Sequence, residues 1–92
     1  MIRSFRHNGL KRLFDHDDVS KLPRDMAERI GIILAALESA TTIEGLNRPS
    51  FRLHQLKGDR KGEWAVVVRA NWRITFTFSD GDAGDVSFED YH

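Results

Sequence analysis

The chain has 92 residues, of which 40% are hydrophobic, and it contains no cysteine. This length predicts a single domain over residues 1–92, with room for one sheet and one layer of helices. The lack of cysteine excludes disulfides and thiolate chemistry, and no apolar run has the length of a membrane span or a signal peptide. We therefore expect a soluble cytoplasmic protein with no membrane partner.

The formal net charge is zero, but the charges are segregated along the chain. Residues 1–14 carry +4, residues 15–44 carry −4, residues 45–79 carry +5, and the remainder carries −5. Overall neutrality argues against nonspecific coating of long nucleic acid, whereas a local basic surface suits a phosphate backbone. For the acidic blocks, a solvated surface is the simpler interpretation.

The first half of the chain predicts a short strand and two helices. Residues 2–5 have an extended pattern, and apolar residues at helical spacing from position 10 to position 14 predict a helix that ends within residues 15–18. Leu22 and Pro23 open a second helix. Its apolar stripe, which we interpret as core, consists of Met26, Ile30, Ile33, Leu34 and Leu37.

After residue 45 the apolar period becomes two, which predicts strands joined by three hairpins. The pairs that keep apolar residues on one face are Phe51 with Val68, Leu53 with Val66, Val68 with Trp72, Val66 with Ile74, Phe76 with Val86, and Ile74 with Phe88, and Gly84 then falls opposite Phe78. We expect residues 57–62 to form a basic loop and Asn71 to be left-handed in a three-residue turn. The fold class is therefore α+β, an N-terminal strand and two helices packed on a C-terminal four-stranded antiparallel meander.

The face of this sheet that points away from the helices supports most of the functional inference. Two rows of neighbours cross it, one of Arg52, Val67, Arg73 and Glu89 and the other of His54, Ala65, Thr75 and Ser87. Small side chains in the second row leave space for a phosphate beside the arginines and the histidine. The simpler interpretation is an ion pair of Arg73 with Glu89 across the strands, and a half-exposed His54 without a catalytic role.

The last three residues, Asp90, Tyr91 and His92, place a carboxylate, a phenol and an imidazole at the end of the final predicted strand. The simpler interpretation is a solvated tail without a function. The alternation in residues 86–89 indicates instead that the sheet directs this tripeptide to a fixed place, with Asp90 beside Trp72 and the chain end near Arg69.

Two motifs are specific when they occur together, the run Arg-Ala-Asn-Trp-Arg at residues 69–73 and the terminal Asp-Tyr-His at residues 90–92. They lie within residues 68–76 and 89–92, and together with residues 1–5, 9–11, 53–54 and 56–60 these segments give the chain a resemblance that spans nearly its whole length. It resembles the HigB toxins of the RelE/ParE superfamily, which are small ribosome-dependent mRNA endonucleases of bacterial toxin–antitoxin pairs.

The resemblance implies a RelE-like microbial ribonuclease fold and inhibition of translation. It implies cleavage of mRNA in the ribosomal A site, by attack of a ribose 2′-hydroxyl on the adjacent phosphate, without a metal or other cofactor. The positions that match the family's catalytic groups are His54, Asp90, Tyr91 and His92. Those that match its phosphate-facing cations are Lys57, Arg69 and Arg73.

The resemblance does not decide which group is the general base. The terminal carboxylate and Asp90 favour the imidazolium form of His92, whereas Arg52 and Arg73 disfavour it at His54. Our hypothesis is that His54 is base-like and His92 acid-like. A zinc site built from His54, Asp90 and His92 is disfavoured, because these residues come from separate strands without a close-spaced ligand pair.

Partners follow from the same resemblance: a HigA-type antitoxin with a helix-turn-helix, the bacterial ribosome at the A site of its small subunit, and mRNA. Operator DNA is expected only through the antitoxin complex, since this chain shows no recognition helix. Either residues 15–18 or the outer faces of the helices could form the antitoxin surface.

The alternative functions are a non-catalytic toxin that poisons gyrase, as in the ParE branch, and a module that only holds RNA.

Overall fold

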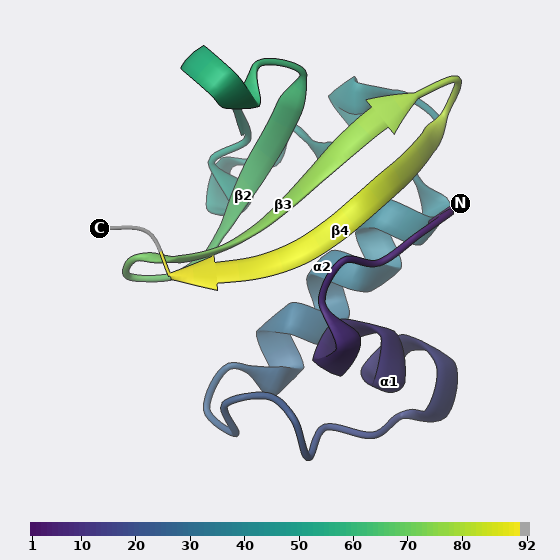
Figure 1. Cartoon of the computed structure of the whole chain (residues 1–92), viewed down its shortest axis with the longest axis vertical. Coiled ribbons are helices and arrows are strands. Elements are labelled where there is room, and N and C mark those ends of the chain that lie inside the picture. The colour runs from purple at the N-terminus through teal and green to yellow at the C-terminus, as the bar shows by residue number, and fades with distance from the viewer. Residues whose placement is uncertain (91–92) are drawn as a thin grey trace.

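The computed structural model describes residues 1–90, which form a four-stranded antiparallel sheet and two helices (Figure 1). The helices are α1 (Asn8–His16) and α2 (Ala27–Ser39). The sheet has the strand order β1 (His54–Gln55), β2 (Glu63–Arg69), β3 (Trp72–Ser79) and β4 (Asp82–Asp90). Short 3-10 turns lie at Ile43–Leu46, Pro49–Phe51 and Gly58–Arg60. This arrangement confirms the predicted α+β meander.

The N-terminal segment runs beside the edge strand β4 as an extended chain. Ile2 and Phe5 form parallel bridges with Ala83 and Val86. The Arg3 N–H donates to the Ala83 carbonyl at 2.7 Å. The predicted N-terminal strand is therefore present as this bridged segment, and it covers backbone groups that an edge strand would otherwise expose.

Local capping sets both ends of α1. The His7 ring accepts a hydrogen bond from the Leu10 N–H at 3.3 Å, and burial lowers the pKa of His7, which favours the neutral ring that this bond requires. At the other end Asp17 is left-handed, with φ 55°, its N–H donates to the Leu13 carbonyl, and the Asp18 N–H donates to the Arg12 carbonyl. The predicted end of the helix within residues 15–18 is confirmed.

The second helix begins later than predicted, at Ala27 rather than at Leu22 and Pro23. The Met26 N–H donates to the Pro23 carbonyl and the Leu22 N–H donates to the Val19 carbonyl, so the residues before Ala27 form separate turns.

No helix within residues 1–90 combines the length and the apolar character needed to cross a membrane.

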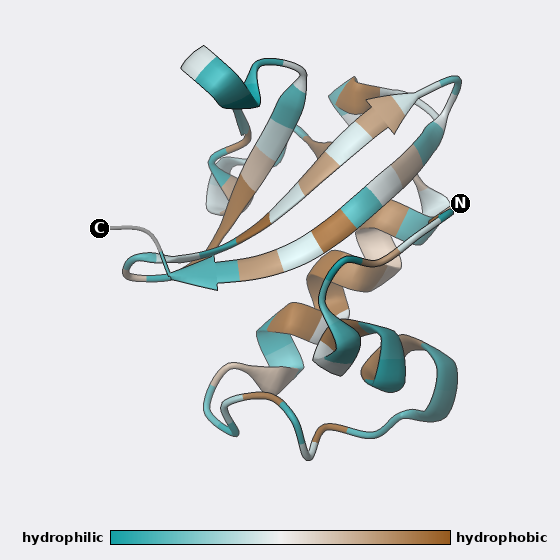
Figure 2. Ribbon diagram, in the orientation of Figure 1, coloured by the Kyte–Doolittle hydropathy of each residue, from teal (hydrophilic) through white to brown (hydrophobic). Residues whose placement is uncertain are grey.

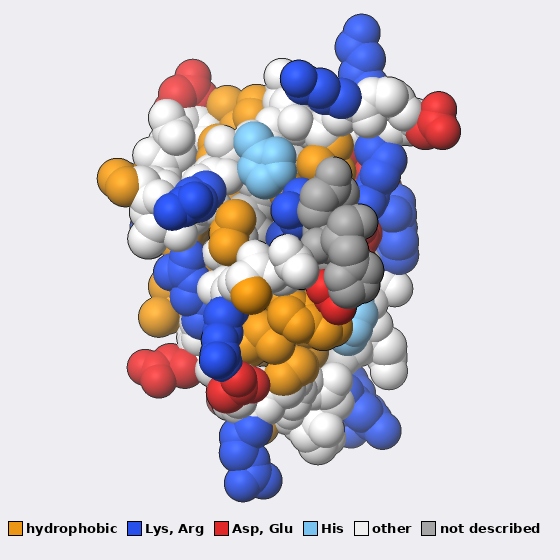
Figure 3. Space-filling view, turned by 90° about the vertical axis from the view of Figure 1, so that its left-hand side faces the viewer, with side chains coloured by type: hydrophobic (Ala, Val, Ile, Leu, Met, Phe, Trp, Pro, Cys, Tyr) orange, Lys and Arg blue, Asp and Glu red, His pale blue; other side chains and the backbone are white. Residues whose placement is uncertain are grey.

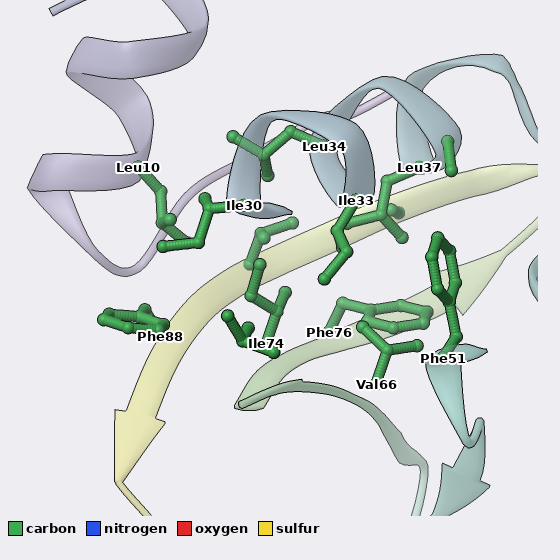
Figure 4. Packing of buried hydrophobic residues seen from close by; sticks show 14 of the residues in the cluster. Leu10, Ile30, Ile33, Leu34, Leu37, Phe51, Val66, Ile74, Phe76 and Phe88 are labelled. Atoms are coloured by element: carbon green, nitrogen blue, oxygen red, sulfur yellow. The ribbon is translucent and has the colours of Figure 1, made fainter. Parts of the chain in front are cut away.

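The hydrophobic core lies between α2 and the sheet. Every residue of the predicted stripe from Met26 to Leu37 is buried in it. In Figure 4, Ile33 and Leu37 extend from α2 toward Phe76 and Phe51. Hydrophobic residues accordingly dominate α2 and recur along the strands, whereas α1 is mostly hydrophilic (Figure 2).

The predicted register is confirmed in the middle of the sheet. The confirmed neighbours are His54 with Ala65, Ala65 with Thr75, Thr75 with Ser87, Val67 with Arg73, and Arg73 with Glu89. These are the two rows expected on the outer face, apart from Arg52.

The first strand is shorter than predicted. Phe51 lies in a 3-10 turn and Arg52 is left-handed, with φ 50°. The predicted pairs of Phe51 with Val68 and of Leu53 with Val66 are therefore wrong, and Arg52 has no place in the outer-face row.

A side chain of α2 explains why the strand stops. The Arg29 guanidinium donates hydrogen bonds to the carbonyls of Ser50, Val67 and Val68. It also lies over the Phe51 ring, 5.4 Å from the centroid. Because Arg29 satisfies these carbonyls, longer pairing of β1 with β2 is not required.

The β2–β3 hairpin contains a bulge that the alternating pattern did not predict. Arg69, and not Val68, stands opposite Trp72, so that Val68 is the extra residue. The connection then has two residues, and Ala70 rather than Asn71 is left-handed, with φ 52°.

The β3–β4 hairpin contains a second bulge. Gly84 pairs with Thr77 and not with Phe78, so Asp85 and Val86 both stand opposite Phe76. Asp85 has φ 48°, which accommodates the extra residue. The predicted pair of Gly84 with Phe78 is thus displaced by one residue, whereas Val86 remains opposite Phe76.

Candidate functional site

The outer face of the sheet has a floor of small, buried side chains. Ala65 and Thr75 are fully buried, and Ser87 is 7% exposed. His54 stands beside this floor on β1, and Arg73 lies in the adjoining row on β3. The sheet therefore brings an imidazole and a guanidinium together, as the register predicted.

A pocket of about 320 Å³ opens at this place. Its lining residues are His54, Gln55, Leu56, Lys57, Arg60 and Arg73. Three of the six side chains are cationic and none is acidic, so the lining favours an anion. Figure 3 shows a face of the molecule on which Lys and Arg side chains lie on either side of a histidine.

The hydrogen bonds of His54 define the orientation of its ring. Nδ1 lies 2.9 Å from the Arg52 carbonyl oxygen, and Nε2 lies 3.4 Å from Nη1 of Arg73. A carbonyl only accepts and a guanidinium only donates, so Nδ1 carries the hydrogen and Nε2 presents its lone pair. In this tautomer Nε2 is the ring nitrogen that can accept a proton.

Arg60 reaches over the sheet from the loop between β1 and β2. It binds Glu63 through Nε at 3.2 Å and Nη2 at 2.9 Å, and Glu89 through Nη1 at 2.6 Å and Nη2 at 2.8 Å. The Thr75 hydroxyl lies 3.4 Å from Nη2 and donates to Glu89 at 3.1 Å. One guanidinium thus joins three strands.

These contacts shift the protonation equilibria of both partners. The hydrogen bond from Arg60, with a smaller contribution from Thr75, lowers the pKa of Glu89. The hydrogen bonds to Glu89 and Glu63 raise the pKa of Arg60 further above its ordinary value. Both ions are therefore charged at neutral pH.

The ion pair proposed between Arg73 and Glu89 is replaced by a different arrangement. The two residues are cross-strand neighbours, but the Glu89 carboxylate binds Arg60, and Nη1 of Arg73 lies next to His54. Arg73 therefore lines the pocket.

The remaining predicted site residues are distributed around this pocket. Lys57 is exposed on its wall. Arg69 lies at the end of β2, outside the pocket lining, and forms an exposed ion pair with Asp25. Asp90 is exposed at the end of β4, opposite Trp72. Tyr91 and His92 lie outside the described residues.

The sequence pattern did not identify Arg60 or its partner Glu63 as part of the site. The only available signal was that Glu63 and Glu89 fall on the same outer face, where two carboxylates require a cation. Within residues 1–90, no cluster of three His, Asp or Glu side chains is arranged to hold a metal ion.

Comparison with known proteins supports a single family. Residues 3–92 match the model of the RelE-like toxin of type II toxin-antitoxin system HigB. The chain is 52% identical over 92 residues to Endoribonuclease HigB of Proteus vulgaris, and the match covers 100% of each chain.

Solved structures agree in fold at low identity. A YafQ mutant from E. coli has a TM-score of 0.64 at 14% identity, covering 98% of this chain and 91% of that one. A chain of the YoeB–YefM complex from Staphylococcus aureus has a TM-score of 0.64 at 17% identity, covering 100% and 95%. These likenesses confirm the fold, and the sequence matches confirm the predicted family: the chain belongs to the HigB-like family of RelE-like toxins of type II toxin–antitoxin systems.

Proposed function

We propose that this toxin is a metal-independent endoribonuclease that cleaves mRNA in the A site of the bacterial ribosome and thereby inhibits translation. The observation that supports this most strongly is the pocket whose lining brings the His54 imidazole together with Lys57 and Arg73. The match to Endoribonuclease HigB over the whole chain agrees with the predicted enzyme class.

The reaction proposed for this pocket is a transesterification within the RNA. The 2′-oxygen of a ribose forms a bond to the adjacent phosphorus, and the bond from phosphorus to the 5′-oxygen of the next nucleotide breaks. A base takes the 2′ proton and an acid supplies a proton to the departing 5′-oxygen. The products are a 2′,3′-cyclic phosphate and a 5′-hydroxyl.

His54 is the proposed base. Its Nδ1 hydrogen is engaged by the Arg52 carbonyl, which leaves the Nε2 lone pair to accept the 2′ proton. The backbone carbonyl also holds the ring in place and stabilises the imidazolium that forms, since Nδ1–H becomes a stronger donor after protonation. His92 is the proposed acid, and Asp90 and Tyr91 complete the proposed catalytic group.

Lys57 and Arg73 are proposed to bind the scissile phosphate. Negative charge on the non-bridging oxygens increases in the transition state, and fixed cations at the pocket wall offset it. Arg69 is proposed as a third phosphate ligand. Its ion pair with Asp25 is exposed, with 62% and 61% of the two side chains accessible, so exchange for a phosphate costs little.

The proposed partners are a HigA-type antitoxin, the ribosome and its bound mRNA, with operator DNA bound only through the antitoxin complex. Membership of a toxin–antitoxin family supports the antitoxin. The ribosome as a partner makes the cytoplasm the proposed site of action.

Programmed ribosomes test this proposal. Wild-type toxin is incubated with ribosomes that hold a defined message, and the cut ends are mapped by primer extension. We expect a cut within the A-site codon that disappears when the nucleotide before the cut has a 2′-deoxyribose. A chelator selective for transition metals, which spares the magnesium of the ribosome, should leave the cut unchanged.

A truncation separates cleavage from a binding mechanism. Deletion of residues 90–92 removes the proposed acid and should abolish both cleavage and growth arrest. Growth arrest that persists without cleavage would favour a non-catalytic toxin.

A further inference from the structure

The loop at residues 57–62, here called the pocket loop, is tied to the sheet through the Arg60 side chain. Its two carboxylate partners are on β2 and β4, and Thr75 is on β3. Each guanidinium nitrogen thus has a partner on the sheet within residues 1–90. The loop that forms one wall of the pocket is therefore fixed against three strands.

The geometry of these contacts is specific to arginine. Arg60 presents one pair of nitrogens to Glu63 and another to Glu89, and Nη2 is shared between them. A planar guanidinium can bind two carboxylates in this way, whereas the ammonium group of a lysine is a single point of charge. Only arginine can therefore hold the carboxylates of Glu63 and Glu89 at the same time.

The contacts extend from Arg60 to groups of the proposed reaction. Within the loop, the Arg60 N–H donates to the Lys57 carbonyl at 3.4 Å, so the turn that contains Arg60 also carries Lys57. On the sheet, Glu89 immediately precedes Asp90, the first residue of the proposed catalytic tripeptide. Arg60 thus connects the two segments that contribute a cation and the terminal groups.

The positive charge of Arg60 is already compensated by two carboxylates. Glu63 and Glu89 side chains are 16% and 29% exposed, and both carboxylates contact the guanidinium directly. An incoming phosphate would have to compete with two bound carboxylates, whereas no described carboxylate forms an ion pair with Lys57.

We propose that Arg60 is a positioning residue, which couples the pocket loop to the end of β4 and does not itself bind the scissile phosphate. Its effect on catalysis rests on the proposed ribonuclease function. The coupling itself is a property of the fold and can be measured without cleavage.

Arg60→Lys and Arg60→Met together test the role in the reaction. Because misplaced groups slow chemistry, we expect both variants to lower kcat on programmed ribosomes by about 10- to 100-fold and to change KM little. The positive charge of the lysine in Arg60→Lys should therefore not restore kcat. Full activity in Arg60→Lys, or a loss confined to KM, would make Arg60 a phosphate ligand and overturn the proposal.

Amide hydrogen exchange tests the coupling directly. In both variants, exchange should speed up together in residues 56–62 and at Glu89 and Asp90, while the amides of β3 keep their protection and show that the fold persists. Unchanged exchange at the loop or at the end of β4 would overturn the proposal.

Arg12→Met is the matched control, because Arg12 also forms a double contact with a carboxylate, that of Asp18 at 2.8 and 2.7 Å, but it is a residue of α1 and not of the pocket loop. It should change neither kcat nor exchange at the pocket loop. If the wild-type toxin leaves the message intact, the proposed function fails, and the exchange measurement still decides whether Arg60 couples the two segments.

Discussion

His54 shows how much of the site depends on single hydrogen bonds. The Arg52 carbonyl fixes the Nδ1 hydrogen, and this leaves Nε2 as the proton acceptor beside Arg73. The left-handed conformation of Arg52 takes this residue out of the sheet. A residue that was expected as a pocket cation thus contributes to the site through its backbone.

Replacing His54 by alanine should reduce cleavage of ribosome-bound message by about 10²- to 10⁴-fold, because the reaction loses its general base. Cleavage rates under single-turnover conditions measure this loss. His16→Ala, at the exposed end of α1, is the matched control and should cleave at the wild-type rate. Equal rates for His54→Ala and wild type would remove His54 from the mechanism.

Glu89 should make the stability of the fold depend on pH. Its ordinary pKa is 4.5, and Arg60 with Thr75 lowers the pKa in the folded chain. The unfolded chain therefore takes up this proton at a higher pH than the folded chain does. The stabilisation is complete above the ordinary pKa and is lost as pH falls through the lowered one.

The pH dependence of Glu89→Gln checks this sign. Wild type should have the higher melting temperature at about pH 7, and the difference should be smaller at about pH 3, because below the ordinary pKa of 4.5 the unfolded chain binds this proton more readily than the folded chain does. Glu44→Gln, at an exposed glutamate without an ion pair in the described chain, is the control. A difference between wild type and Glu89→Gln that is the same at both pH values would contradict the prediction.

The residues that sequence reasoning placed correctly are those on regular strands. His54 and Arg73 could be brought together because alternation fixes which face each side chain occupies. Arg60 could not be placed, because its direction depends on a 3-10 turn and on glycines at positive φ. The positions of residues on irregular loops do not follow from periodicity.

At the scale of elements, the hydrophobic pattern predicted the central register but missed both bulges. The apolar residue Val68 fits a regular strand and gave no signal of its bulge, whereas Gly84 and Asp85 are residue types that are unfavourable in a strand and coincide with the second bulge. The end of β1 depends on the Arg29 hydrogen bonds to loop carbonyls, which involve a partner distant in sequence. Local patterns therefore predicted the sheet and the side chains on each of its faces, whereas the turns depend on tertiary contacts that a local pattern does not contain.

Two glycines on different elements should respond oppositely to alanine. Gly81 has φ 81° in the β3–β4 turn, and a Cβ there would lie 3.1 Å from the Thr41 carbonyl oxygen. Gly31 lies in the interior of α2, where a Cβ would meet no neighbour within 4 Å. Strain should make Gly81→Ala less stable by about 1–2 kcal/mol, whereas helix propensity should make Gly31→Ala more stable by about 0.5–1 kcal/mol.

Urea denaturation of the two variants and wild type measures these differences. The same substitution is made at each site, so each variant is the control for the other. A loss of stability in Gly31→Ala would show that α2 is packed more tightly than its open surface at this position indicates.

At the scale of the whole molecule, the two faces of the sheet have different roles, one in stability and the other in the proposed function. The face toward α2 buries the core, and the outer face supports the pocket. The basic block of residues 45–79 supplies all the pocket residues. The acidic block at the end of the chain is more than a solvated surface, because Asp82 pairs with Arg3 at 2.7 Å and Glu89 pairs with Arg60.

The end group of the cleaved message tests the central claim most directly, namely that this pocket promotes attack by a 2′-hydroxyl. Wild-type toxin is incubated with programmed ribosomes, and the fragment upstream of the cut is analysed by mass spectrometry. We predict a 2′,3′-cyclic phosphate on that fragment and a 5′-hydroxyl on the other. A 3′-hydroxyl with a 5′-phosphate, the products of attack by water from the opposite side, would contradict the account.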